Sequence, residues 1–201
     1  LETDLDGIPV VISRTGWTGE MGYEIYLRDP SRGNELWERI MKAGKPHNIR
    51  PIAPCEARKI EAGILNHGQS MTIENNPYEI MGFERLVEDQ STDYIGKQAL
   101  AKIKQKGVKK RMVGIKVSLE RTALWMEDAW PVCKDGKQIG KITDLAWSPR
   151  LEQNIGYVWV QAEYSSPGIE LEINSIDGKL KGVTSKIPFI DPKKKTPSVK
   201  L

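Results

Sequence analysis

The sequence predicts an α+β fold, in which an antiparallel sheet with helices is followed by a small antiparallel barrel or sandwich. A glycine-rich hairpin opens the chain at residues 1–27, and helical apolar stripes follow it. After residue 107 the pattern changes to short strand-like runs, at 112–117, 130–133, 139–143, 155–160, 169–173 and 180–186. We therefore expect two domains, at residues 1–107 and 108–201.

Helix signals divide the first part. A helix is expected from Pro30, after Asp29 as its cap, to Gly44, and a second one over residues 55–65 after Pro54. A polar loop at 66–76 leads to an expected strand at 78–87, and a third helix ends at Gly107.

Composition excludes several classes of function. The 201 residues are 39% hydrophobic, which suffices for real cores, and 30 basic against 27 acidic residues give a net charge of only +3. We therefore expect no nucleic-acid partner. Two cysteines and two histidines form no cluster at metal-ligand spacing. Without an apolar run of about 20 residues or a signal segment, the expected location is the cytoplasm, with no membrane partner.

The stretch RTGWTGEMGYEIYL at residues 14–27 is the candidate site. Its end alternates like a strand, so Tyr23, Ile25 and Leu27 share one face, expected to be core, and Glu24 and Tyr26 share the other. A planar heterocycle with adjacent N–H donors could stack on Trp17 and Tyr26 and bind Glu24. The pattern also fits an ordinary hairpin with a polar outer face.

Three motifs carry a resemblance to a known family. Residues 14–27 resemble the GYTGExGxEI signature of the glycine-cleavage T protein family of folate-dependent aminomethyltransferases, with Trp17 at the first aromatic position. Residues 49–68, IRPIAPCEARKIEAGILNHG, resemble its helix that ends in an EAG triplet, and residues 76–83 read NPYEIMGF. The last two segments look most like the dimethylsulfoniopropionate demethylase branch. The resemblance covers about the second half of a family member.

The resemblance implies a C-terminal β-barrel and a tetrahydrofolate pocket. Glu24 matches the acid that grips the pterin, Trp17 and Tyr26 would wall the pocket, and Glu20 is a rival for the acid's role. His67 replaces the tyrosine of an LYG turn, so it either contacts folate or substrate or is an ordinary loop histidine. Cys55 stands where the family has the arginine that binds the folate tail, and Arg50 or Arg58 could replace that arginine.

The implied reaction moves a methyl or aminomethyl group from a heteroatom of a small-molecule donor to tetrahydrofolate. The family's catalytic aspartate lies in the N-terminal half, so these residues include no catalytic group and should be inactive alone, with that half as their partner. Two alternatives remain open: a non-catalytic folate-binding regulatory or repair module, and the folate domain of a larger dehydrogenase.

Overall fold

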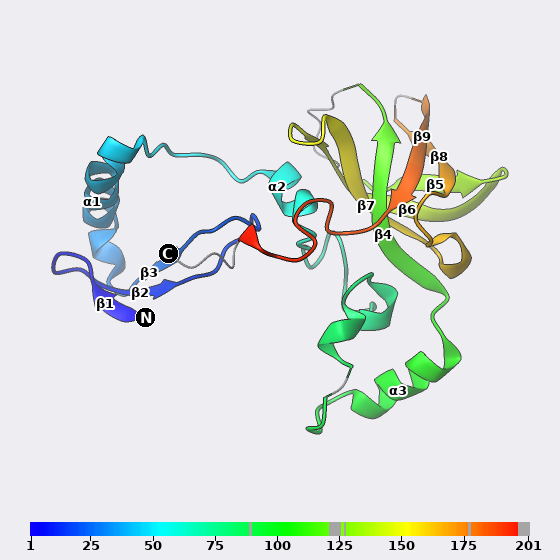
Figure 1. Ribbon diagram of the computed structural model, residues 1–201, viewed down its shortest axis with the longest axis horizontal. Coiled ribbons are helices and arrows are strands. Elements are labelled where there is room, and N and C mark those ends of the chain that lie inside the picture. Colours follow the sequence, from blue (N-terminus) through cyan, green and yellow to red (C-terminus); the bar gives the residue numbers. More distant parts are fainter. Residues whose placement is uncertain (89, 121–125, 127, 177, 197–201) are drawn as a thin grey trace. The chain divides into compact units, whose positions relative to one another are not determined.

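The computed structural model describes residues 1–88, 90–120, 126, 128–176 and 178–196. They divide into two compact units: Leu1–Cys55 together with the chain end from Lys194, and Glu56–Lys193 (Figure 1). The domain boundary after residue 107 stays a prediction. All the helices in the described ranges are too short or too polar to cross a membrane.

The first unit is a three-stranded antiparallel sheet with one long helix. The sheet order is β1 (Glu2–Asp4), β2 (Pro9–Ser13), β3 (Glu24–Leu27). As predicted, Asp29 caps the next segment: its carboxylate accepts hydrogen bonds from the Ser31 N–H at 3.0 Å and hydroxyl at 2.7 Å. These bonds lower the pKa of Asp29. The helical segment consists of η1 (Pro30–Arg32), α1 (Gly33–Gly44) and η2 (Lys45–His47).

The core of this unit lies between the sheet and α1. Ile8, Val10 and Leu36 are buried there, with Leu27 and Ile40 packed against them. The expectation that all of one face of β3 is core is wrong, because Tyr23 and Ile25 are 50% and 36% exposed. Only Leu27, paired with Val10, joins this core.

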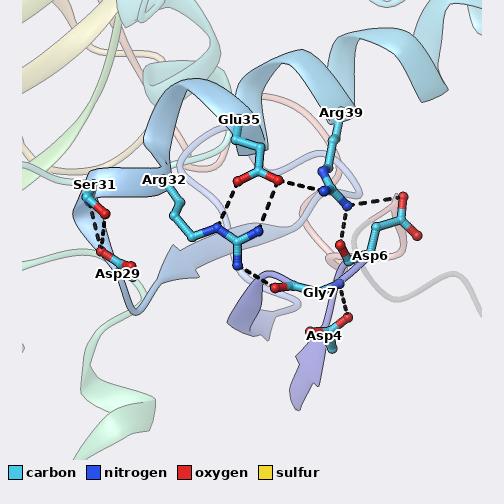
Figure 2. Close-up of polar contacts among 8 residues, drawn as sticks. All are labelled: Asp4, Asp6, Gly7, Asp29, Ser31, Arg32, Glu35 and Arg39. Atoms are coloured by element: carbon cyan, nitrogen blue, oxygen red, sulfur yellow. Dashed lines mark hydrogen bonds and ion pairs between the residues drawn. The ribbon is translucent and has the colours of Figure 1, made fainter.

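Two arginines tie α1 to the turn between β1 and β2 (Figure 2). Arg32 donates to both carboxylate oxygens of Glu35, at 2.8 and 3.0 Å, and to the carbonyl of Gly7. Arg39 donates to Glu35 at 2.6 Å and to the carbonyl of Asp6. Glu35 therefore holds two guanidinium groups in place against the turn.

The second unit is built on a closed six-stranded barrel. Its strands are β4 (Lys110–Ser118), β5 (Trp130–Lys134), β6 (Lys137–Ser148), β7 (Gln153–Gln161), β8 (Glu170–Ser175) and β9 (Gly178–Ser185). They close in the order β4-β7-β6-β5-β8-β9, with a short η5 (Ala162–Tyr164) after β7. The predicted α+β fold with a C-terminal barrel is confirmed, and all six expected runs are strands.

Two apolar clusters use opposite faces of the same strands. Val158 and Val160 of β7 face the barrel interior with residues of the other strands. Tyr157 and Trp159, which alternate with them, join Ile60 of α2 (Glu56–Glu61) in a second cluster. The helix α2 therefore packs on the outside of the barrel.

This helix is shorter than the predicted 55–65. Gly63 takes a left-handed φ of 70°, the Gly63 N–H bonds the Ile60 carbonyl at 3.0 Å, and the Ile64 N–H bonds the Lys59 carbonyl at 3.0 Å. This paired return is the Schellman motif, which ends a helix. A side chain at Gly63 would also lie 3.2 Å from Pro188.

The strand expected at 78–87 is wrong. The segment forms η3 (Pro77–Glu79) and η4 (Glu84–Leu86), and Ile80 alone bridges to Met112. Asn76 and Glu79 make a reciprocal capping box, which starts a helical turn where the apolar pattern suggested a strand. The third helix, α3 (Lys97–Lys106), ends at Gly107 as predicted.

The bonds from Arg32 and Arg39 predict acid sensitivity of the first unit. They lower the pKa of Glu35 from 4.5 to about 2, the bond from Arg32 contributing most. A depressed pKa in the folded state stabilises the fold above pH 4.5, and this stabilisation is lost as the pH falls through 2. We expect Glu35→Gln to reduce the loss of helix signal between these pH values, measured by circular dichroism.

Glu38→Gln on the same helix is the control, because Glu38 has no ion pair within the described part of the chain. An acid transition of the same size in the wild type, Glu35→Gln and Glu38→Gln would contradict the role given to Glu35.

Candidate functional site

The turn between β2 and β3 carries two of the predicted site residues, Trp17 and Glu20. Gly19 adopts a left-handed φ of 71°, so one of the three glycines of the turn needs a conformation that other residues avoid. Glu20 lies in this turn, half-buried, and its backbone N–H donates to the Thr18 hydroxyl at 3.3 Å. Trp17 lies in the same turn and is 56% exposed.

Glu24 and Tyr26 share a face of β3, as the alternation predicts, and both are exposed. The Tyr26 hydroxyl donates to Oε2 of Glu24 at 3.2 Å, and the Thr15 hydroxyl, across the turn, donates to the same oxygen. Oε1 accepts no hydrogen bond from any residue that the structure describes. One oxygen is therefore fixed by hydroxyls, and the other is open to a donor.

His67 belongs to the second unit and is exposed. It lies in a tight turn, where it forms a bridge with Met71 and the next N–H, from Gly68, bonds the Met71 carbonyl at 2.7 Å. The structure brings Glu24 and Tyr26 together, with Trp17 and Glu20 in the adjoining turn. A shared role of His67 with them stays a prediction.

Sequence reasoning missed a buried polar network between α2 and the barrel. Lys59 is 1% exposed and Asp144 of β6 is fully buried, and their side chains meet at 2.9 Å. Ser70 donates to the same Asp144 oxygen at 2.9 Å, and Thr143 donates to the other at 2.8 Å. Glu56, one helical turn before Lys59, pairs with Lys59 at 2.5 Å. Each of these buried polar groups therefore has a partner.

Two aromatic side chains extend this network. The Tyr157 hydroxyl lies 3.0 Å from the carbonyl oxygen of Ile64 and 3.3 Å from those of Lys59 and Ile60, so these three acceptors share its one proton. Burial raises the pKa of Tyr157, and the nearby carboxylates of Asp144 and Glu56 raise it further. The tyrosine therefore stays a neutral donor that holds the end of α2. Trp159 donates to the Ser70 carbonyl at 2.9 Å.

Glu61, the acid of the EAG triplet, is buried beside this network. It accepts a hydrogen bond from the Ser148 hydroxyl at 2.6 Å, and its backbone carbonyl accepts from Phe189 at 2.9 Å and Ile190 at 3.0 Å. The motif on which the resemblance rests therefore fastens α2 to the barrel. A usable signal was present at Asp144, a charged residue within a strand pattern that is flanked by Ile142 and Leu145.

Two family models together cover most of the chain. The model described as "GCVT N-terminal domain" matches residues 1–90, and the model described as "Glycine cleavage T-protein C-terminal barrel domain" matches residues 110–191. The chain belongs to the glycine-cleavage T protein family. The resemblance identified in the three motifs is thereby confirmed.

Relatives named as aminomethyltransferases and a relative named as a demethylase are similar to this T-protein-family chain. A "Probable aminomethyltransferase" of Pyrococcus furiosus is 32% identical over 95% of this chain and 53% of its own length. An "Aminomethyltransferase" of Clostridium botulinum is 37% identical over 96% and 51%. A "Dimethylsulfoniopropionate demethylase" of Ruegeria pomeroyi is 33% identical over 86% and 46%. The chain spans about half the length of these relatives.

A solved structure has the same fold. The crystal structure of the glycine cleavage system aminomethyltransferase T from Bartonella henselae matches with a TM-score of 0.78 and 22% sequence identity, over 90% of this chain and 49% of that chain. At this identity the likeness shows the fold alone.

The ion pair between Lys59 and Asp144 gives a test of the buried network. Asp144→Ala leaves the Lys59 ammonium buried with only Glu56 as its partner. We expect the free energy of unfolding of the second unit to fall by about 3–5 kcal/mol, as for other broken buried pairs. Urea unfolding followed by tyrosine and tryptophan circular dichroism measures this loss.

Lys59→Met with Asp144→Leu removes both charges and should recover most of the loss. Lys179→Ala, which breaks an exposed pair with Glu172 at 2.8 Å, is the control and should cost under about 1 kcal/mol. A similar small cost for Asp144→Ala would show that the network does not fasten α2.

Proposed function

We propose that the chain is the C-terminal portion of a tetrahydrofolate-dependent one-carbon transferase. The reaction moves a methyl or aminomethyl group from a heteroatom of a small donor to the folate. Membership of the glycine-cleavage T protein family supports this proposal. The observation that carries the site is the carboxylate of Glu24, which is fixed through one oxygen and open at the other, beside the exposed ring of Tyr26 and next in sequence to the turn that carries the exposed Trp17.

The residues present fit the pterin end of tetrahydrofolate. A carboxylate offers about four acceptor positions, and the Thr15 and Tyr26 hydroxyls use two of them, both on Oε2. Oε1 can therefore accept a ring N–H directly. A second N–H of the same ring would displace one of the two hydroxyls from Oε2. The hydrogen bond from Tyr26 is long for an O–H donor, at 3.2 Å, so displacing this hydroxyl costs little.

Two aromatic side chains provide the other contacts proposed for the folate ring. Trp17 and Tyr26 are 56% and 53% exposed, so each offers a ring face to a flat heterocycle. Stacking on such rings and charge-assisted hydrogen bonds to Glu24 together fix both the plane and the rotation of the ligand. Glu20, held within the turn, is the alternative acid.

Tetrahydrofolate, when bound, supplies the nitrogen that accepts the one-carbon group. The part of this chain is alignment: Glu24 orients the ring, and Trp17 and Tyr26 keep water from its faces. Alignment of two reactants in a closed site supplies much of the acceleration in such a reaction. We assign no catalytic residue in this chain.

The partner in this proposal is the N-terminal half that the resemblance implies, which would carry the catalytic aspartate. We therefore expect these 201 residues to show no turnover of a methyl or aminomethyl donor on their own. The proposed location is the cytoplasm. For the donor we favour the demethylase branch, on the strength of the segments IRP, IEAG and NPYEIMGF.

One observation favours a second function, a folate-binding module without transferase chemistry. Cys55, at the position of the arginine that binds the folate tail in the family, is a free, exposed cysteine. Loss of that arginine removes a tail contact and leaves the ring contacts. An aspartate at the catalytic position of the N-terminal half supports transfer, and its replacement supports the binding module.

Replacement of Glu24 tests the proposed grip. Glu24→Gln keeps the shape of the side chain and removes its charge. Because hydrogen bonds to a charged group are worth about 1.5–3 kcal/mol, we expect tetrahydrofolate to bind about 10–100-fold more weakly. Calorimetric titration of the full-length protein measures this change. Tyr26→Phe should keep most of the affinity, and Tyr26→Ala should lose the stacking surface.

Glu20→Gln is the matched control and should change the affinity by less than about twofold. A large loss in Glu20→Gln with none in Glu24→Gln would transfer the role to Glu20. Unchanged affinity in both variants would show that folate does not bind at this turn.

A further inference from the structure

We propose that the groove beside the C-terminal half of α1 is a docking surface for an acidic, partly apolar segment of a partner protein. The groove has a volume of about 930 Å³, and all its lining residues belong to the first unit. Its walls are the outer face of α1 and the chain that returns beside it. Its lining contains none of Glu24, Trp17, Tyr26 and Glu20, the residues proposed for the folate ring.

The groove is created by the way α1 ends. Asn48 takes a left-handed φ of 57°, and the Ile49 N–H then bonds the Gly44 carbonyl at 3.1 Å. A side chain on Gly44 would lie 2.5 Å from Cγ2 of Ile49, so the glycine is what allows this close return. Ile49 and Arg50 are thereby held against the helix.

The charge of the groove is positive. Lys42, Lys45 and Arg50 line it, and no residue that the structure describes pairs with their side chains. The Glu35 and Arg39 side chains also line it, but they are paired with each other at 2.6 Å (Figure 2). Three cations without partners therefore face one unpaired carboxylate of the lining, that of Glu38.

Size and apolar content select the occupant. Met41 and Ile49 lie in the lining, and Ile49 is 39% exposed, so an occupant gains from apolar side chains. A volume of about 930 Å³ is far larger than one phosphate needs. A nucleic-acid backbone would meet the Glu38 carboxylate, and the net charge of +3 gives it little long-range attraction. A peptide that alternates acidic and apolar residues matches both features.

The groove lies along α1, and the proposed folate-ring site lies on the face of β3 that points away from α1. Leu27 packs toward α1, whereas Glu24 and Tyr26 alternate with it and point to the other face. The docked segment and the folate ring would therefore not compete. This inference stands whether or not the proposed function is correct.

A designed peptide tests the groove directly. The probe is a fluorescein-labelled peptide of about ten residues that alternates glutamate and leucine, long enough to span roughly 30 Å when extended. Its binding to the 201-residue chain is followed by fluorescence anisotropy at low salt. We expect Lys45→Glu with Arg50→Glu to weaken binding by about tenfold, because two attractions become repulsions.

Lys102→Glu with Lys106→Glu on α3 is the matched control. Both lysines are exposed, have no partner within the described ranges, and change the net charge by the same amount. This pair should change the affinity by less than about twofold. Gly44→Val alters the shape of the groove without altering its charge, and should also weaken binding. Circular dichroism checks that each variant is folded. If Gly44→Val does not fold, the two charge variants alone test the proposal.

Several results would overturn the proposal. These are no binding of the peptide, equal losses in the two double variants, or equal binding of an all-glutamate peptide, which would indicate a simple polyanion site. Stronger binding of a thymidine oligonucleotide of the same charge would indicate nucleic acid. Self-association of the chain in sedimentation, lost in Lys45→Glu with Arg50→Glu, would indicate a second copy as the occupant. Displacement of the peptide by tetrahydrofolate would show that the groove and the folate site overlap.

Discussion

The buried carboxylate of Asp144 is the constraint on which the second unit depends. It lies on a barrel strand and accepts hydrogen bonds from Lys59 of α2 and from Ser70 in the loop after it. A charge without water must keep its partners, because leaving one of them unpaired costs several kcal/mol. The shared carboxylate therefore holds the helix, the loop and the strand in one arrangement. Apolar packing alone would define this arrangement less specifically.

The barrel could be predicted because its pattern is local. Each strand contains a short run rich in apolar residues, and turn signals such as Asp135-Gly136, whose residues take φ of 50° and 76°, separate several of these runs. Residues 78–87 misled the prediction because the capping pair of Asn76 and Glu79 decides their conformation more strongly than apolar content. The predicted helix at 55–65 was too long because Gly63, in its left-handed conformation, ends α2.

The candidate site was predictable in part for the same reason. Alternation alone places Glu24 and Tyr26 on one face of β3, and their hydrogen bond follows. Thr15 was missed because its contact with Glu24 depends on how the turn brings together residues nine apart. Lys59 was missed because a lysine on a helix is normally solvated, and only the tertiary partner Asp144 makes its burial favourable.

Closure of the barrel has a consequence for handling the protein. In the closed barrel every strand is paired on both sides, whereas β1 and β3 are the outermost strands of an open three-stranded sheet. Within the described part of the chain, no strand pairs with the outer edge of β3, so its N–H and C=O groups form a template for another extended chain, and the exposed side chains of Tyr23 and Ile25 lie beside them. Aggregation of these 201 residues in isolation would therefore begin at the small sheet and leave the barrel intact.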